Sequence, residues 1–347
     1  MKRKCFSYFF SLSIWAIMGG CVFAGADAGT QKLQRFEYSQ PHMATLFRIV
    51  LYAADKQSAE AAATAAFKKI EDINQMMSDY LDDSELMQLC KKSGGPPVKI
   101  SAELFDLIAF SRDLSVRSNG AFDITVGPVV RLWRKARKSG TLPDKEELAK
   151  ATELVGYQKM LLDEKQSTVQ LLKEGMRLDL GGIAKGDVAN KAIQVLKEHG
   201  IESALVVGGG DICVSHSPPG TDGWTIGIGA LENPGGTPGE FLLLHDAGIS
   251  TAGDFEQNLQ VGGKRYSHII DPKTGMPLNG RTSVTVVSPT GRQSDGLDTT
   301  VDVLGIEKGL ELIESVEGAA ALIVRATDKG QERIESKRWK DLLKKKP

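Results

Sequence analysis

A histidine beside a stiff turn is the first feature of this sequence that could do chemistry. His268 lies in the run YSHIIDPKTGMP at 266–277. Alternating side chains predict a short strand as far as Ile270, and Asp271-Pro272 with Gly275 predict a tight turn after it. A histidine held there can exchange a proton near neutral pH. The alternative is an ordinary histidine before a hairpin turn, and this run alone does not decide between them.

A second run, RLDLGGIAKG at 177–186, joins a glycine turn to a helix predicted to continue to about His199. The free N–H groups and the dipole at a helix N-terminus favour a phosphate group there. The spacing is neither that of a Walker A loop nor that of a Rossmann fingerprint. The alternative is a plain strand-to-helix turn that needs small residues for packing.

A third run, SDGLDTT at 294–300, opens a predicted helix. Asp295 and Thr299 are four residues apart and therefore share one face of that helix. A carboxylate and a hydroxyl there could hold a hard cation if phosphate oxygens supply further ligands. The alternative is an N-cap aspartate with a solvent-exposed threonine. Separately, the three glycines at 208–210, before Asp211, would let a ligand approach the backbone closely.

Short strands and amphipathic helices must position these runs. Apolar residues at helical spacing predict helices over 58–77 and 101–118, and a short helix after Ser84. Strand-like runs occur over 46–53 and, with hairpin-sized gaps, through much of 203–290. Further expectations are a bend at 127–128, a surface loop and helix over 134–150, a hairpin over 161–172, a β-like start at 177–179 and a last strand over 319–324. The basic end over 336–347 is expected to be solvated, and the alternative is a contact for anionic lipid.

The composition excludes several classes of protein. The chain has 347 residues, of which 41% are hydrophobic, and a formal net charge of −1, so it can bury a core and has no basic excess typical of a nucleic-acid binder. The four cysteines, at 5, 21, 90 and 213, form no Cys-x-x-Cys pair. Structural zinc and thioredoxin-like sites are therefore not expected.

The first twenty residues have the pattern of an export signal. Three basic residues at 2–4 precede an apolar segment over 6–18 and then Gly19-Gly20-Cys21, a segment too short for a permanent membrane span. Small residues before Cys21 resemble a lipobox, although Met18 is unusual three positions before the cysteine; the alternative is cleavage near Ala24 or Ala26. We therefore expect a signal peptide at 1–20, a linker at 21–40, a catalytic domain at 41–330 and a basic tail at 331–347.

Seven short sequence runs, taken together in chain order, form a specific pattern. They are MSDYLDDSEL, GAFDITVGP, LDLGGIAKG, VGGGDI, ISTAGD, YSHIIDPKTG and SDGLDTT, and they cover about residues 40 to 325. Each is weak alone, but together and in this order they are specific. The chain thus resembles the FAD:protein FMN transferases, the ApbE-like flavin transferase family. The resemblance implies an exported enzyme of α+β fold, with largely antiparallel sheets flanked by helices in a T-fold-like architecture.

The resemblance also implies site residues. The Asp295 carboxylate, the Thr299 hydroxyl and the Ala184 carbonyl match metal ligands, and His268 matches the candidate base. Lys185 is our own addition, as a cation near the diphosphate. The positions that match the flavin-nucleotide site are Met43, Tyr80, Ala121, Phe122, Asp123, Gly181, Asp187 and Ile269. Departures from the family pattern are Cys90 in place of asparagine, Ala252 in place of serine, and an extra carboxylate, Asp298, which could alter metal affinity.

By resemblance, the reaction is a magnesium-dependent transfer of the FMN moiety of FAD to a threonine hydroxyl of a target flavoprotein, with release of AMP. The expected partners are subunits of membrane redox pumps, and the expected location is the periplasmic face of the inner membrane, with a lipid anchor on Cys21. An oxygen-only site suits magnesium, and histidine suits the role of base. Two alternatives stay open: an exported FAD pyrophosphatase, and a flavin-binding protein without turnover. By family likeness, a tyrosine at position 80 favours transfer.

Overall fold

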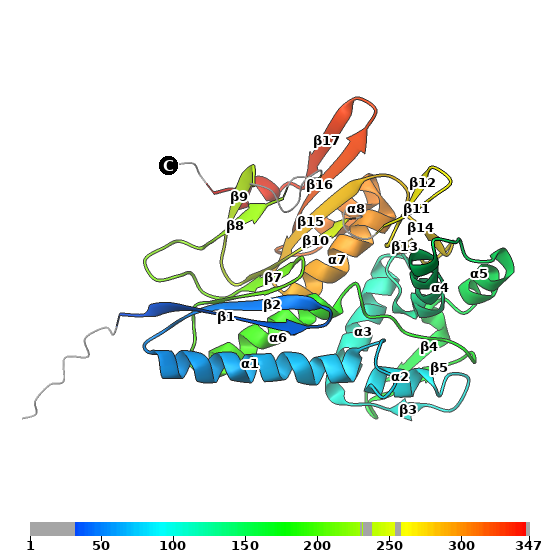
Figure 1. The fold of residues 1–347 in the computed structure, drawn as a ribbon, viewed down its shortest axis with the longest axis horizontal. Helices are drawn as coiled ribbons and strands as arrows, with labels where there is room; N and C mark the ends of the chain where they lie inside the picture. The colour runs from blue at the N-terminus through cyan, green and yellow to red at the C-terminus, as the bar shows by residue number, and fades with distance from the viewer. Residues whose placement is uncertain (1–31, 230, 232–237, 254–257, 345–347) are drawn as a thin grey trace, which may run out of the picture. The chain divides into compact units, whose positions relative to one another are not determined.

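The computed structural model describes residues 32–229, 231, 238–253 and 258–344. In this part of the chain, eight strands form one antiparallel sheet (Figure 1). Their order across the sheet is β1 (Gln34–His42), β2 (Thr45–Ala53), β6 (Ala204–Gly208), β7 (Asp211–Val214), β10 (Ala247–Gly253), β15 (Thr282–Ser288), β16 (Ala320–Thr327) and β17 (Gly330–Glu335).

Each face of this sheet is buried by different elements. Alternate residues of β2 show the pattern, because Ile49 and Leu51 belong to one buried cluster and Val50 to another. The first cluster packs under four helices, α1 (Lys56–Met77), α6 (Ala184–Glu198), α7 (Gly291–Leu304) and α8 (Ile306–Glu314). The second packs under the hairpin of β8 (Trp224–Ile228) and β9 (Glu240–Leu244) and under the 3₁₀ turn η3 (Trp339–Leu342).

The chain between β2 and β6 adds a smaller group of elements after α1. It contains α2 (Glu85–Cys90), α3 (Ala102–Arg117), η1 (Ile124–Val126), α4 (Gly127–Ser139), α5 (Lys145–Thr152), η2 (Tyr157–Lys159) and a sheet of β3 (Val98–Lys99), β5 (Thr168–Leu171) and β4 (Met160–Asp163). Two further hairpins pair β11 (Asn258–Val261) with β12 (Lys264–Ser267) and β13 (Ile270–Asp271) with β14 (Met276–Pro277).

The expected fold class, α+β with largely antiparallel sheets, is confirmed, and so are the helices over 58–77 and 101–118 and the strand over 46–53. Three local expectations were wrong. Pro128 does not bend the chain away but lies in the first turn of α4, where a missing N–H costs nothing. Residues 177–179 form no strand. The predicted single strand through His268 is interrupted by a bend at that residue.

The C-terminal end also differs from the expected solvated tail. β16 is not the last strand, because β17 pairs with it at the sheet edge. Trp339 follows and is fully buried in the second cluster, with its indole N–H donating to Glu240 at 3.1 Å. The many lysines and arginines around Trp339 led to the prediction of a solvated end, and the burial of this single apolar side chain was missed.

Candidate functional site

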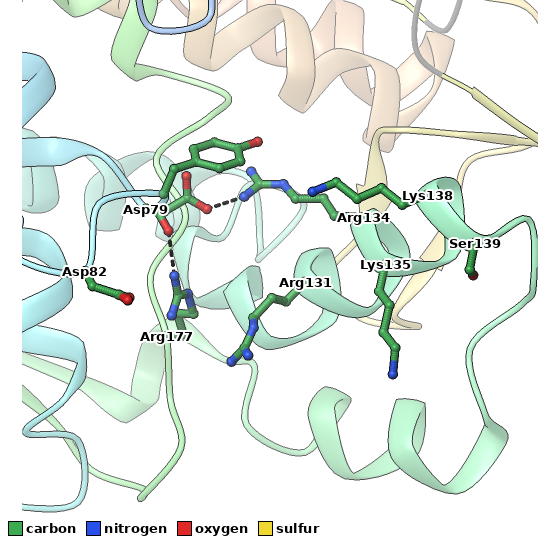
Figure 2. A pocket seen from close by; sticks show the side chains of 9 residues that line it. Asp79, Asp82, Arg131, Arg134, Lys135, Lys138, Ser139 and Arg177 are labelled. Atoms are coloured by element: carbon green, nitrogen blue, oxygen red, sulfur yellow. Dashed lines mark hydrogen bonds and ion pairs between the residues drawn. The ribbon is translucent and has the colours of Figure 1, made fainter.

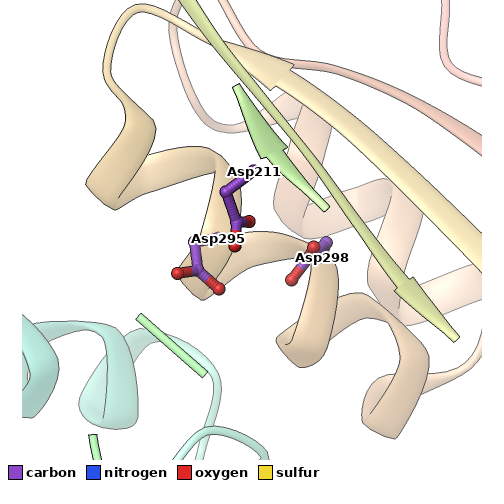
Figure 3. Close-up of side chains that lie close together, drawn as sticks. All are labelled: Asp211, Asp295 and Asp298. Carbon is purple, nitrogen blue, oxygen red and sulfur yellow. The ribbon is translucent and has the colours of Figure 1, made fainter. Parts of the chain in front are cut away.

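Three buried carboxylates converge beneath the sheet. Asp211 begins β7, whereas Asp295 and Asp298 lie three residues apart on α7 (Figure 3). Each of the three residues is 3% exposed, and one oxygen from each lies within 4.8 Å of the others. A cluster of oxygen ligands like this matches what a hard divalent cation prefers.

Glycines allow the N-terminal turn of α6 to approach α7 closely beside this cluster. A Cβ on Gly186 would lie 2.1 Å from the carbonyl oxygen of Gly291 and 2.6 Å from Cβ of Asp295. The Gly186 N–H donates to Asp295 Oδ2 at 2.8 Å. Because the first N–H groups of a helix lack partners within that helix, this bond fixes Asp295 against the N-terminal turn of α6.

The predicted metal ligands come together at this crossing. Ala184 is the first residue of α6, two positions before Gly186. Thr299 lies beside the preceding turn, since a Cβ on Gly182 would be 3.3 Å from Thr299 Oγ1. The start of α6 therefore runs along α7 from Thr299 to Asp295, with Ala184 between the two contacts.

The charge of the cluster is only partly compensated. Lys185 Nζ lies 2.5 Å from Asp211 Oδ2, and this carboxylate holds the pKa of Lys185 above its usual value. Burial, reinforced by the Asp211 charge, raises the pKa of Asp295 to about 7. Burial likewise raises the pKa of Asp298 well above its usual range, with Asp295 adding to the shift. One lysine faces three carboxylates, so the residues present fit a bound divalent cation.

Asp211 was missing from the predicted ligand set. The available signal was its position directly after three glycines, which the sequence analysis associated with ligand approach. Asp298 was noted only as a departure from the family pattern. Lys185 pairs with Asp211, and its predicted position near a diphosphate stays a prediction. The turn that contains Met43 lies nearby, because a Cβ on Gly209 would be 3.7 Å from Thr45 Oγ1 and 3.9 Å from Lys185 Cδ.

A buried loop forms the next part of the site. Phe122 contacts the glycine turn, with its Cε2 3.6 Å from the position of a Cβ on Gly182. Ala121, Phe122 and Asp123 are all buried. Asp123 Oδ1 accepts from the Thr125 hydroxyl at 2.6 Å, and Oδ2 accepts from the Tyr157 N–H at 2.7 Å. The Asp123 side chain therefore shapes the loop, although burial raises its pKa.

Tyr80 is linked to the glycine turn through two charged residues. The Tyr80 side chain is 73% exposed, and the Arg134 guanidinium lies 4.6 Å from its ring centroid. Arg134 pairs with Asp79 and, at 2.8 Å, with Asp179. Asp179 in turn accepts from the Gly181 N–H at 2.8 Å. Tyr80 and Gly181, both predicted to hold the nucleotide, are thus linked through Arg134 and Asp179. Tyr80 and Arg134 line a cavity of about 670 Å³, and Figure 2 shows the charged side chains around it.

His268 lies in the bend between β12 and β13 and is half-buried, as expected for a residue at a strand end. The hairpin that follows it is anchored, since the Trp133 indole N–H donates to the Gly275 carbonyl at 2.9 Å. Lys273 contacts the loop before Ala121, because a Cβ on Gly120 would be 3.8 Å from Lys273 Cε. Ile269 is buried in the same bend. The segment that contains His268 and Ile269 therefore lies close to the loop over 119–123.

Asp187, a further predicted nucleotide contact, has a different environment. Its carboxylate is 1% exposed and pairs with Arg292 at 2.7 Å and with Lys191 at 3.0 Å. These cations also pair with Asp106 and Glu103, so the carboxylate of Asp187 ties α6 to α7 and α3. Its role toward a ligand stays a prediction.

Comparison with known proteins agrees with this geometry. A model of the ApbE family matches residues 43–323. The FAD:protein FMN transferase of Treponema pallidum (strain Nichols) is 30% identical over 340 residues, which cover 93% of this chain and 92% of the relative. The FAD:protein FMN transferase of Haemophilus influenzae is 34% identical over 268 residues, which cover 75% of this chain and 77% of the relative.

Solved structures give the same result. The flavin transferase ApbE from Vibrio cholerae matches with a TM-score of 0.80 and 30% identity over 90% of this chain and 100% of that chain. An ApbE protein from Thermotoga maritima matches with a TM-score of 0.80 and 28% identity over the same shares. The fold and the similar proteins place this chain among the transferase enzymes. The chain belongs to the ApbE family, and the predicted resemblance is confirmed.

Proposed function

We propose that this protein transfers the FMN moiety of FAD to a threonine hydroxyl of a target flavoprotein and releases AMP. The observation that carries the proposal is the cluster of Asp211, Asp295 and Asp298, locked to the N-terminal turn of α6. The names of the similar proteins support the flavin substrate. The α6 N-terminus favours a phosphate group beside a site that fits a divalent cation.

The reaction balances with one bond formed and one broken. The threonine oxygen attacks the phosphorus of the FMN half, the bond from that phosphorus to the bridging oxygen breaks, and AMP leaves. His268 accepts the hydroxyl proton, a role for which a half-buried histidine is suited at neutral pH. Asp295, Thr299 and the Ala184 carbonyl would hold Mg²⁺, with Asp298 and Asp211 beside them. Magnesium, when bound, supplies positive charge that neutralises the phosphate oxygens.

One incubation tests this proposal against its rivals. Purified protein is mixed with FAD, MgCl₂ and a candidate acceptor, such as the flavin-bearing subunit of a membrane redox pump. A transferase gives covalent flavin on the acceptor and one AMP for each flavin attached. AMP without covalent flavin would show a pyrophosphatase, and neither product would show a binding protein. Either result would contradict the proposed transfer.

The proposed location rests on the first residues, which lie outside the described part of the chain. Lys2 to Lys4, the apolar segment and the small residues before Cys21 support export to the periplasmic face of the inner membrane with a lipid on Cys21. Among the described residues, no helix is long and apolar enough to cross a membrane. Metabolic labelling with a fatty acid tests the anchor, because Cys21→Ala would abolish the label if Cys21 is the attachment point.

A further inference from the structure

Helix α4 bears an unusual concentration of positive charge. Its thirteen residues include five cations and no acid. Among these five, Arg134 alone forms an ion pair in the described part of the chain. Arg131, Lys135 and Lys138, called here the basic ridge, are exposed and line the 670 Å³ cavity that Tyr80 also lines. Figure 2 shows Arg131 and Lys135 extending from the same side of the helix.

The basic ridge differs from the ordinary charged surface of this protein. On α1, Lys56 and Lys68 each have an acid four residues later, the spacing that stabilises a helix. The residues of the ridge are four and three apart, so they share one helix face, but that face offers only like charges. The acids that line the cavity are Asp79 and Asp82, and the Asp79 carboxylate is already bound by Arg134. Neither Asp82 nor any other acid among the described residues forms an ion pair with the ridge, so its positive charge is available to a molecule outside this chain.

We infer that the basic ridge binds an acidic segment of the acceptor protein and so brings its threonine to the site. This inference rests on the proposed function, since it names what the acceptor must offer. The network of Tyr80, Arg134, Asp179 and Gly181 connects the ridge to the glycine turn of α6. A chain docked on the ridge thus lies next to the candidate nucleotide site. Because the cations line a concavity, a peptide fits them better than a flat membrane surface does.

The test measures peptide binding to the full protein with FAD and Mg²⁺ present. Two labelled peptides of equal length carry one threonine each, flanked by glutamates in one and by glutamines in the other. We expect the acidic peptide to bind about tenfold more tightly, because the small binding free energies of three exposed ion pairs add together. The preference should fade at high salt. The triple variant Arg131→Glu, Lys135→Glu, Lys138→Glu should abolish it and leave the Kd for FAD unchanged.

A matched variant controls for net charge. Arg112→Glu, Lys308→Glu, Lys329→Glu changes the charge equally at exposed positions outside the cavity, and it should keep the preference. Equal binding of both peptides to the unaltered protein, or a preference that survives in the ridge variant, would overturn the inference. A loss of FAD affinity in the ridge variant would also overturn the inference, because it would show that the cavity binds the nucleotide. Loss of binding to phosphatidylglycerol vesicles, with the peptide preference kept, would assign the ridge to the membrane.

Peptide binding does not require turnover. Absence of AMP and of covalent flavin, with the peptide preference intact, would therefore contradict the proposed function and leave the ridge as a docking surface. Conversely, normal flavin transfer without any peptide preference would contradict the ridge alone.

Discussion

The carboxylate of Asp295 accepts a 2.8 Å hydrogen bond from the backbone N–H of Gly186, which joins α6 to α7 beside the carboxylate cluster. We predict that Asp295→Asn retains this bond and the fold but loses magnesium-dependent AMP release by about a hundredfold or more, the scale expected for a lost electrostatic group at a reacting phosphate. The measurement is AMP release from FAD across a magnesium titration. Asp113→Asn, on the exposed face of α3, is the control. Normal turnover of Asp295→Asn at low magnesium would place the metal elsewhere.

His268→Asn should retain FAD affinity and lose transfer by about a hundredfold, the usual contribution of a general base. The paired measurement is the Kd for FAD and the transfer rate of the same variant. If His268 only orders the turn over 271–275, then Tm and FAD affinity will fall with the rate, and the base is another group. His216→Asn is the control, because that ring is 60% exposed and pairs with Asp246 in a different part of the structure.

Lys185→Met should make the protein depend more on magnesium for its stability. The variant leaves three buried carboxylates without their nearby cation, and we expect a loss of about 1–2 kcal/mol, or a few degrees in Tm, in the metal-free protein. Saturating MgCl₂ should restore most of this loss, so that the metal-induced rise in Tm exceeds that of the unaltered protein. In Lys197→Met, which breaks an exposed pair with Asp246, magnesium should cause no extra rise. An equal metal response in both variants would argue against a cation among the carboxylates.

Gly186→Ala should separate α6 from α7. The added Cβ would collide with the Gly291 carbonyl, a backbone atom that cannot rotate away, so we expect a loss of about 1–3 kcal/mol in the free energy of unfolding. Activity should fall as well, because the bond to Asp295 lengthens. Gly239→Ala is the control, because its Cβ meets nothing within 4 Å. Urea unfolding measures both variants, and equal stability would contradict this account of the helix crossing.

The sequence pattern predicted the helices, the strands and the functional residues within a single element. It did not predict contacts between residues of different elements. Asp295 and Thr299 could be paired because both lie on one helix, where spacing determines the face. Asp211 could not be added in the same way, since it comes from a strand more than eighty residues earlier in the chain. The link from Tyr80 to Gly181 was equally hidden, because it passes through Arg134 and Asp179, which no motif connects.

The predicted fold was correct where periodicity was strong. The helices α1 and α3 and the strand β2 follow from regular apolar spacing. The C-terminal end was wrong because Trp339 is a single apolar residue among charged ones, and burial of one side chain leaves no period to detect. The environment of Asp187 was not predicted either, because its partner Arg292 lies on α7, about a hundred residues later in the chain.

Strands β2 and β6 are neighbours in the sheet, although about 150 residues of chain separate them. Most of that chain forms the elements that include Tyr80 and the basic ridge, whereas Asp211, Asp295 and Asp298 come from later segments. The proposed docking surface on α4 thus precedes residue 140 and the three carboxylates follow residue 210, whereas the turn at 184–186 that bonds to Asp295 lies between them in the chain. A chimaera that exchanges residues 85–171 between relatives would therefore replace the proposed docking surface and keep α6, α7 and β7 from one parent.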